Sequence, residues 1–462
     1  MTERVEFKPI SIDDLSSQYD VIIIGAGSTG LTSALELTEL GKKVVVLEKM
    51  EKPGGNSMRA SSGMNAAETA IQRHEGIIDS YESFYEDTYK GGGKQNDVEM
   101  LKYFTSHADS AVEWLKEHDV VLDEITLTGG MSVKRAHRPS SAPAIGGYLI
   151  HQLLNKLAEE KVPVVCGATV REIDRGDNHQ FKVDFADAQG SNHLLNSAAI
   201  ILATGGFAAS DALIKKYRPD LVHYKTTNHP GATGDGLQLA ENLGAQLVDM
   251  DQIQVHPTVY QDGDHAFLIG EMVRGEGAIL VNQSGHRFVN ELDTRKVVTD
   301  AINAQTQPDA YLIFNAALAK RVSAIGFYDH IGLVQHGDHI DELAKTLGLP
   351  AANLKETMQR WSDVVAKRKD EAFGRTMGLV DGFEEGPYMA IHIAPAIHYT
   401  MGGLKTSAKA EVLDKKFKPI KGLYAGGEVA GGLHGNNRIG GNSIAETVVF
   451  GLQAARQAFK NL

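Results

Sequence analysis

The pattern of apolar and polar residues predicts a strand, a helix and a second strand near the start of the chain. The run 21–24 is continuously apolar, which is typical of a parallel strand buried on both faces. A helix is predicted next, because its inward-facing residues recur on one side: Leu31, Ala34, Leu35 and Thr38. Gly41 ends this helix, and the apolar run 44–47 closes on Glu48. We interpret these segments as a βαβ unit with a right-handed crossover.

The rest of the chain divides into glycine-rich regions and one region in which glycine motifs are rare. Helices are predicted at 79–118, 145–160, 209–217, 234–243 and 442–458, and apolar strands at 162–165, 181–185, 198–203 and 423–425. Between about 251 and 398 the glycine motifs become rare, and mixed helices are predicted at 296–304, 340–346 and 351–369. The glycine-rich style returns after 399. We therefore expect one domain, formed by 1–250 and 399–462, that is interrupted by an inserted domain at 251–398.

A glycine motif of the form G-x-G-x-x-G joins the first strand to the first helix. Gly25 permits the tight turn, Gly27 lets the backbone approach a pyrophosphate, and Gly30 lets the helix pack on the strand. The helix N-terminus offers N–H donors and partial positive charge to phosphates. Glu48 ends the next strand and can accept from ribose hydroxyls, which disfavours a 2′-phosphate. The unit predicts FAD or NAD over NADP, and by itself it does not decide between them.

Composition narrows the classes of function. The formal net charge is −13, so nothing favours binding to nucleic acid or insertion into an anionic membrane. The single cysteine, Cys166, cannot form an intramolecular disulfide and excludes a C-x-x-C-H haem site and an all-cysteine iron–sulfur cluster. No metal site is predicted. The charged N-terminal segment lacks an apolar signal region, and no run approaches the roughly 20 apolar residues of a membrane span, so we expect a cytoplasmic protein.

Two further glycine motifs favour FAD. The segment 52–57 reads KPGGNS just past Glu48, and ATGG at 203–206 ends a later strand. This arrangement resembles flavoproteins of the two-dinucleotide-binding-domain type, in which these glycines line the flavin. The expected fold class is therefore α/β, with a Rossmann-like FAD-binding domain and an inserted α+β capping, or clamp, domain.

Seven motifs, in the order given, point to a more specific family among these flavoproteins. They are GGNSMRASSGMNAA (54–67), NHPGATGDGL (228–237), QVHPT (254–258), GEMVRGEGAILVN (270–282), NELDTR (290–295), HYTMGG (398–403) and GLYAGGEVAGGLHGNNRIGGNSIAE (422–446). From about 19 to 460 the chain resembles the soluble fumarate reductase flavoproteins, relatives of the succinate dehydrogenase flavoprotein subunit. The resemblance implies an enzyme that reduces fumarate to succinate.

The resemblance also implies the cofactor contacts. They are Gly25, Gly27, Gly30, Glu48, Asn56, Ser57, Gly63, Met64, Val170, Thr204, Gly205, Asp235, Glu428, Ser443 and Ile444. Membrane-bound relatives hold the flavin covalently through a histidine in the segment that matches 54–63. That segment has no histidine here, so we expect non-covalent FAD.

For the substrate, the resemblance implies that positive and donating groups hold both ends of a diacid. His398 and Arg438 are expected on one carboxylate and His256 near the other. In some family members a threonine donates a hydrogen bond to the substrate, and it stands immediately before the glutamate that matches Glu271. Gly270 occupies that position here, which removes one hydroxyl and leaves room for a differently shaped acid.

The resemblance implies that Arg295 protonates the double bond. A free guanidinium has a pKa of about 12.5 or more, so such an acid requires immediate re-protonation. Glu271 and Arg274 are the implied relay, and their i, i+3 spacing places them on one face of a helix.

Other functions stay open at this point. Relatives reduce urocanate, acrylate or cinnamate-type acids, and L-aspartate oxidase is a further enzyme candidate. The urocanate-specific relatives resemble each other in carrying a tyrosine where this chain has His256, so the histidine favours a dicarboxylate. A flavoprotein subunit that only relays electrons is the alternative outside the enzymes. The expected partners are a small unsaturated acid and an unknown electron donor, either reduced flavin or a reductase.

Overall fold

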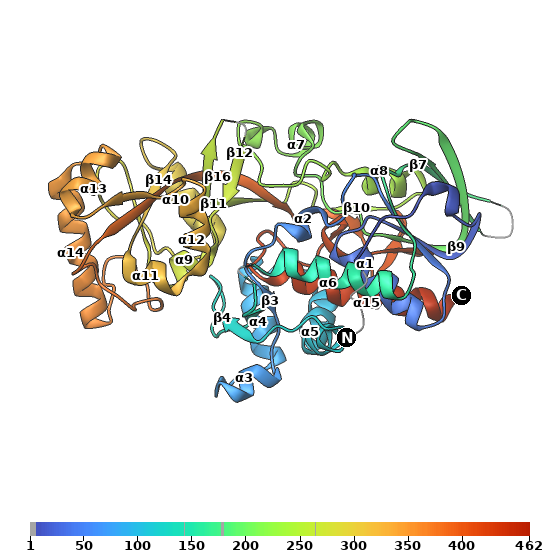
Figure 1. The fold of residues 1–462 in the computed structure, drawn as a ribbon, viewed down its shortest axis with the longest axis horizontal. Coiled ribbons are helices and arrows are strands. Elements are labelled where there is room, and N and C mark those ends of the chain that lie inside the picture. Colours follow the sequence, from blue (N-terminus) through green and yellow to red (C-terminus); the bar gives the residue numbers. More distant parts are fainter. Residues whose placement is uncertain (1–5, 143, 177–179, 264) are drawn as a thin grey trace.

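The chain folds into two lobes joined side by side (Figure 1). The structure is a computed structural model and describes residues 6–142, 144–176, 180–263 and 265–462. The N-terminal and C-terminal segments, blue and red in Figure 1, lie together in the larger lobe. The yellow and orange segments form the smaller lobe, and the long strand β16 (Tyr388–Thr400) runs from it toward the larger one.

The larger lobe is built on an eight-stranded sheet. Its strands in spatial order are β18 (Glu411–Leu413), β19 (Pro419–Ala425), β9 (Asn192–Leu202), β1 (Gln18–Ile24), β2 (Val44–Glu48) and β6 (Val164–Cys166), and the hairpin of β7 (Thr169–Arg175) and β8 (Phe181–Ala186) extends from β9. The five central strands from β19 to β6 are parallel. The apolar residues of β1 are almost completely buried, as expected for a parallel strand that is covered on both faces.

Two hydrophobic cores cover the faces of this sheet. The first contains residues of α1 (Ser28–Glu39), α4 (Tyr81–Gly91), α5 (Val98–Glu117), α6 (Ile145–Glu159) and α15 (Asn442–Asn461). The second contains residues of α7 (Asp211–Tyr217), α8 (Asp235–Asn242) and the small sheet β10 (Leu247–Val248), β17 (Gly403–Lys405) and β20 (Ala430–Gly431). Helix α15 packs on α1, so segments from the two ends of the chain share one core.

The smaller lobe contains a six-stranded, mainly antiparallel sheet. Its order is β12 (His265–Leu268), β11 (Ile253–Asp262), β16, β14 (Ala310–Asn315) and β13 (Ile279–Val281), with β15 (Gln335–Gly337) also paired to β16. Its helices are α9 (Glu271–Gly275), α10 (Arg295–Asn303), α11 (Ala316–Arg321), α12 (Ser323–His330), α13 (Ile340–Leu347) and α14 (Ala351–Lys367). The buried residues of its two cores lie between 269 and 393, and the partly buried Tyr260 of β11 packs against one of them.

Short elements complete the larger lobe. They are the three-stranded sheet β3 (Met64–Asn65), β5 (Ala136–Arg138) and β4 (Glu124–Thr126), the helices α2 (Gly55–Met58) and α3 (Ala70–His74), and the 3-10 turns Ile12–Asp14, Pro219–Leu221 and Gly427–Val429. None of the helices in the described ranges is long and apolar enough to cross a membrane.

The predicted α/β fold class, a Rossmann-like sheet with a capping lobe, is confirmed. The helical region 79–118 is two helices, because α4 ends at Gly91 and the glycines at 92 and 93 lie between it and α5. The predicted strand 198–203 is the end of the longer strand β9. The chain enters the second sheet at Ile253 and leaves it at Thr400, so we propose 251–398 as the capping domain and 1–250 with 399–462 as the FAD-binding domain.

Candidate active site

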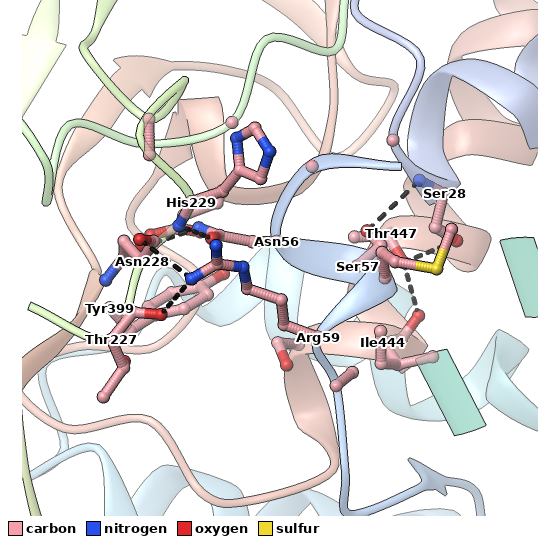
Figure 2. A pocket seen from close by; sticks show the side chains of 18 of the residues that line it. Ser28, Asn56, Ser57, Arg59, Thr227, Asn228, His229, Tyr399, Ile444 and Thr447 are labelled. Atoms are coloured by element: carbon pink, nitrogen blue, oxygen red, sulfur yellow. Dashed lines mark hydrogen bonds between the residues drawn. The ribbon is translucent and has the colours of Figure 1, made fainter. Parts of the chain in front are cut away.

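A cavity of about 1100 Å³ lies between the carboxyl ends of the parallel strands and the capping lobe. Its walls include the ends of β1, β2 and β9 and residues of α12 in the capping lobe. Ligands of open parallel sheets bind in this place, outside the carboxyl ends of the strands. Figure 2 shows part of the wall, with Ser28, Ser57 and Thr447 on one side and Asn56, Asn228 and His229 on the other.

The glycine turn after β1 has the backbone shape that the motif predicts. Gly25 has φ +105°, and a side chain there would clash with the carbonyl of Ala203. A side chain at Gly30 would clash with the carbonyl of Gly25, so Gly30 serves the packing of α1 on the strand. The N-terminus of α1, which starts at Ser28, therefore faces the cavity next to Gly27.

Glu48, at the end of β2, also lines the cavity. Its Oε2 accepts from the backbone N–H of Ala26 at 2.9 Å, and its Oε1 accepts from that of Met50 at 2.9 Å. Burial raises the pKa of this carboxyl, and the two backbone N–H groups counteract part of that rise. Each carboxylate oxygen retains acceptor capacity for a ribose hydroxyl.

The predicted cofactor contacts converge on this cavity. All of them except Gly30 and Met64 are among the residues that line it. Met64 instead packs into the core against α15. The Oγ1 atom of Thr204 is buried without a hydrogen-bond partner in the described chain, and the N-terminus of α15 opens into the cavity at Ser443. Unsatisfied donors, a helix N-terminus and a volume above the roughly 1,000 Å³ of common ligand pockets fit a large dinucleotide such as FAD.

Asn56 links the cofactor wall to Glu428. The Asn56 Nδ2 donates to Asn228 Oδ1 at 2.6 Å and lies 3.4 Å from Glu428 Oε2, while its Oδ1 accepts from the backbone N–H of His229 at 2.7 Å (Figure 2). The other oxygen of Glu428 accepts from the backbone N–H and the hydroxyl of Thr400. Burial is the largest effect on Glu428 and raises its pKa to about 7.

The raised pKa of Glu428 predicts a pH dependence of stability in the FAD-free protein. The folded state binds this proton more tightly than the unfolded chain, so the stabilisation is complete below pH 4.5 and is lost as the pH rises through about 7. Between pH 4 and pH 8, wild-type protein should lose about 3 kcal/mol more unfolding free energy than the isosteric Glu428→Gln variant. Urea denaturation across this range measures the difference, and equal pH slopes in the two proteins would contradict it.

A buried ion pair forms the wall on the side of the capping lobe. Arg295 begins α10, and its Nε donates to Glu271 Oε1 at 2.6 Å. Its Nη1 donates to Gln254 Oε1 at 2.8 Å. Burial raises the pKa of Glu271, but the Arg295 and Arg274 guanidinium groups outweigh it and hold that pKa below its usual value. Glu271 is therefore ionised in the resting protein.

Arg274 lies behind Glu271, away from the cavity. Its Nη2 is 3.7 Å from Glu271 Oε1, and its Nη1 donates to the carbonyl of Glu291 at 2.7 Å. Arg375 donates to the carbonyl of Arg274 and forms a buried ion pair with Glu291. Burial lowers the pKa of Arg274 to about 10. The relay pair is thus held at both ends by a buried network.

The two histidines face each other from neighbouring strands. The rings of His256 on β11 and His398 on β16 have centroids 5.1 Å apart, and burial lowers the pKa of both well below the usual value. The Nδ1 of His256 accepts from the backbone N–H of Thr258, so the neutral ring carries its proton on Nε2. That Nε2 is buried without a hydrogen-bond partner among the residues described and lies 4.0 Å from Glu271 Oε1.

Arg438 completes the cluster from the larger lobe. Its guanidinium lies over the ring of Tyr399, with the carbon 4.3 Å from the centroid. The Tyr399 hydroxyl donates to Glu446 Oε2 at 2.6 Å, and His434 Nε2 lies 2.8 Å from the same oxygen. The Nε of Arg438 is buried without a partner in the part of the chain that is described. Burial, together with the nearby Arg295 cation, lowers the pKa of Arg438 to about 10.

The structure therefore brings the predicted substrate residues to one place, at different depths. Arg295, Glu271, Gly270, His398 and Arg438 line the cavity. His256 and Arg274 stand behind that lining and contact it through Glu271.

Sequence reasoning missed three neighbours of this cluster: Gln254, Tyr399 and Tyr328. Gln254 lies two residues before His256 on β11, but the register of this strand shifts between Gln254 and Val255, so simple alternation does not predict the direction of its side chain. Tyr328 lies in a helix with no glycine motif near it, and nothing in the sequence pattern marks it.

The fold, the cavity and the matching family define the protein as an FAD-dependent oxidoreductase. The chain belongs to the FAD binding domain family, which matches residues 20–444, and within it to the fumarate reductase flavoproteins. The predicted family and the FAD cofactor are thereby confirmed.

The comparisons with individual proteins cover nearly the whole chain. The NADH:fumarate oxidoreductase of Klebsiella pneumoniae (strain 342) is 43% identical over 97% of this chain, which spans only 48% of that protein. The fumarate reductase (cytochrome) of Shewanella frigidimarina is 39% identical over 96% of this chain and 77% of its own length. A urocanate reductase of Eggerthella lenta is 33% identical over 99% of this chain and 77% of its own length.

The comparison with solved structures also finds a fumarate reductase flavoprotein. The open conformation of a flavocytochrome c3 fumarate reductase superposes with a TM-score of 0.80 at 37% identity, over 97% of this chain and 79% of that one.

Proposed function

We propose that this chain reduces the C=C bond of a small unsaturated dicarboxylate, namely fumarate to succinate. The observation that carries the proposal is the Arg295–Glu271–Gln254 cluster at the wall of a cavity that also contains Arg438 and His398. Two buried cations on a cavity of an acidic protein provide local attraction for a dianion.

Residues of both lobes are proposed to bind the two carboxylates of the substrate. Arg438 presents to one carboxylate a guanidinium whose Nε has no hydrogen-bond partner among the described residues, and His398 stands beside it as a neutral imidazole. His256 stands behind the lining near the other end, and its neutral Nε2–H lies 4.0 Å from Glu271 Oε1. Groups on both ends draw charge away from the alkene, which stabilises the transition state more than the ground state.

FAD, when bound, supplies the hydride, and Arg295 supplies the proton. Two of the three guanidinium nitrogens of Arg295 are engaged by Glu271 and Gln254, which fixes the plane of the group. No described residue hydrogen-bonds Nη2, so we assign proton donation to that atom. Glu271 accepts at Nε and has Arg274 on its far side, so these two residues are the proposed route for re-protonation.

Reduction of another unsaturated acid is the second candidate. Gly270 leaves space in the wall, and the Eggerthella lenta relative is a urocanate reductase. Against it, this chain carries His256 at the position where the urocanate-specific relatives resemble each other in carrying a tyrosine. The electron donor in this proposal is a reduced flavin or a reductase partner, and the location is cytoplasmic, which the single cysteine supports.

The test is steady-state oxidation of reduced methyl viologen by the purified FAD-loaded protein. Fumarate should give kcat/KM at least about 100-fold above urocanate, acrylate and cinnamate, because each of these lacks a second carboxylate on the alkene and leaves a buried donor unpaired. A preference for urocanate would select the second candidate. Absence of turnover with every acid would instead indicate a subunit that only relays electrons.

A further inference from the structure

Two hydroxyl groups converge on the cavity wall at Gly270. A Cβ atom at Gly270 would lie 3.5 Å from Tyr328 Oη and 3.7 Å from Ser61 Oγ. Tyr328 comes from α12 of the capping lobe, whereas Ser61 follows α2 in the larger lobe. Both residues line the cavity, as does Gly270 itself.

Neither hydroxyl donates a hydrogen bond to a described residue. The Tyr328 Oη accepts from the backbone N–H of Gly270 at 3.1 Å, and no residue in the described ranges accepts from it. The Ser61 Oγ is buried with no hydrogen-bond partner there. Burial raises the pKa of Tyr328, a side chain only 6% exposed, so its hydroxyl is protonated at neutral pH and is able to donate. A buried donor without an acceptor is costly, which favours a ligand that supplies one.

The hydroxyl pair lies at the His256 end of the site. The carbonyl of Ile269 accepts from Thr258 Oγ1 at 3.0 Å, and the backbone N–H of Thr258 donates to His256 Nδ1 at 3.2 Å. This short chain of contacts ties the wall at Gly270 to the His256 ring. Gly270 also precedes Glu271 directly, so the pair stands next to the acid–base cluster.

Charges of both signs lie near the pair: the Glu271 carboxylate follows Gly270, and the Arg138 guanidinium, whose Nε is 3.6 Å from Glu124 Oε2, lies near Tyr328. The guanidinium of Arg138 lies close enough to counteract part of the burial effect on the pKa of Tyr328. Arg138 is itself buried, and its Nη1 lies 3.3 Å from the sulfur of Met272, a residue of the cavity wall. Two donors beside a buried cation suit a carboxylate.

We infer that the hydroxyls of Tyr328 and Ser61 bind the substrate carboxylate at the His256 end, so that Tyr328 sets the preference for a dicarboxylate over a monocarboxylate. The inference rests on the proposed function and assigns its specificity to a residue of the capping lobe. Gly270 leaves the space through which these two hydroxyls reach the ligand.

The experiment compares Tyr328→Phe with wild-type protein by ligand titration of the oxidised, FAD-loaded form. Succinate and butyrate have the same chain length and differ by one carboxylate, and their binding is followed by the flavin absorbance. We expect the Kd for succinate to rise about 10-fold or more in the variant, since a hydrogen bond to a charged group is lost. The Kd for butyrate should stay unchanged, and KM for fumarate should rise more than kcat falls.

Matched variants separate a contact with substrate from a general effect. Tyr388 is another buried tyrosine of the capping lobe, and its hydroxyl donates to the carbonyl of Phe383 away from the cavity. Tyr388→Phe should therefore leave the Kd for succinate and the Kd for butyrate unchanged. Gly270 has φ −59°, which any residue adopts, so a side chain fits there. Gly270→Ser should restore succinate binding in the Tyr328→Phe background, whereas Gly270→Ala should not.

The outcomes distinguish this inference from the proposed function. If wild-type protein turns over fumarate and binds succinate, but Tyr328→Phe does so equally well, the inference fails alone. If wild-type protein neither binds succinate nor reduces fumarate, the proposed function fails and the inference falls with it.

Discussion

Replacing Arg295 with alanine should lower fumarate turnover by about 10³-fold or more, because the variant lacks the only proton donor that the proposed mechanism uses. The FAD absorbance spectrum should remain, since Arg295 is not among the predicted cofactor contacts. Stopped-flow and steady-state reduction of fumarate by the viologen-reduced enzyme, together with the visible spectrum, measure both properties.

A neighbouring cation provides the control for Arg295. Lys296 follows it on α10, is largely exposed and pairs with Asp300, so Lys296→Ala should leave turnover unchanged. Loss of Arg295 also leaves Glu271 buried with a weaker charge partner, so thermal unfolding must show that the variant is folded at the assay temperature. Near-normal turnover in a folded Arg295→Ala protein would refute the acid role.

Replacing Arg438 with alanine should raise KM for fumarate and lower kcat together, with kcat/KM reduced by about 10²-fold or more. The guanidinium is expected to bind one carboxylate in the ground state and more strongly as charge develops. Steady-state kinetics over a range of fumarate concentrations separates the two constants.

Arg438→Lys is the matched variant for this prediction. It keeps the charge but loses the planar fork and the stacking on Tyr399, so it should recover only part of the loss. A variant in which KM rises while kcat stays at the wild-type value would show that Arg438 binds substrate uniformly and does not act on the transition state.

The dinucleotide-binding half of the molecule was predictable because its signals are local. A buried strand, three glycines, a helix and Glu48 lie within 31 consecutive residues, and the structure shows the turn that this order predicts. The capping lobe was harder to predict. Its strands β11 and β16 carry prolines, contain register shifts and are buried without regular alternation, so their pattern predicts neither a strand nor a helix clearly.

In the candidate site, too, the residues in local motifs were predictable, whereas the long-range contacts between them were not. The resemblance supplied Arg295, Glu271 and Arg438 by their positions in motifs, and the structure places all three on one cavity. The contacts that orient them join residues far apart in the chain, such as Arg295 with Gln254 and Arg438 with Tyr399. Such pairs depend on how β11, β16 and α10 pack, which no short-range pattern encodes.

The position of the capping lobe within the sequence also has a consequence for the order of events on the ribosome. Its cores and its sheet use residues between 253 and 400, so it is able to fold as soon as that stretch has emerged. The larger lobe must wait, because the 3-10 turn Gly427–Val429 and α15 follow in the chain and supply Glu428, Ser443 and Ile444. Nascent protein therefore becomes competent to capture FAD only after the final helix has docked on α1, and truncation of α15 should yield a colourless chain.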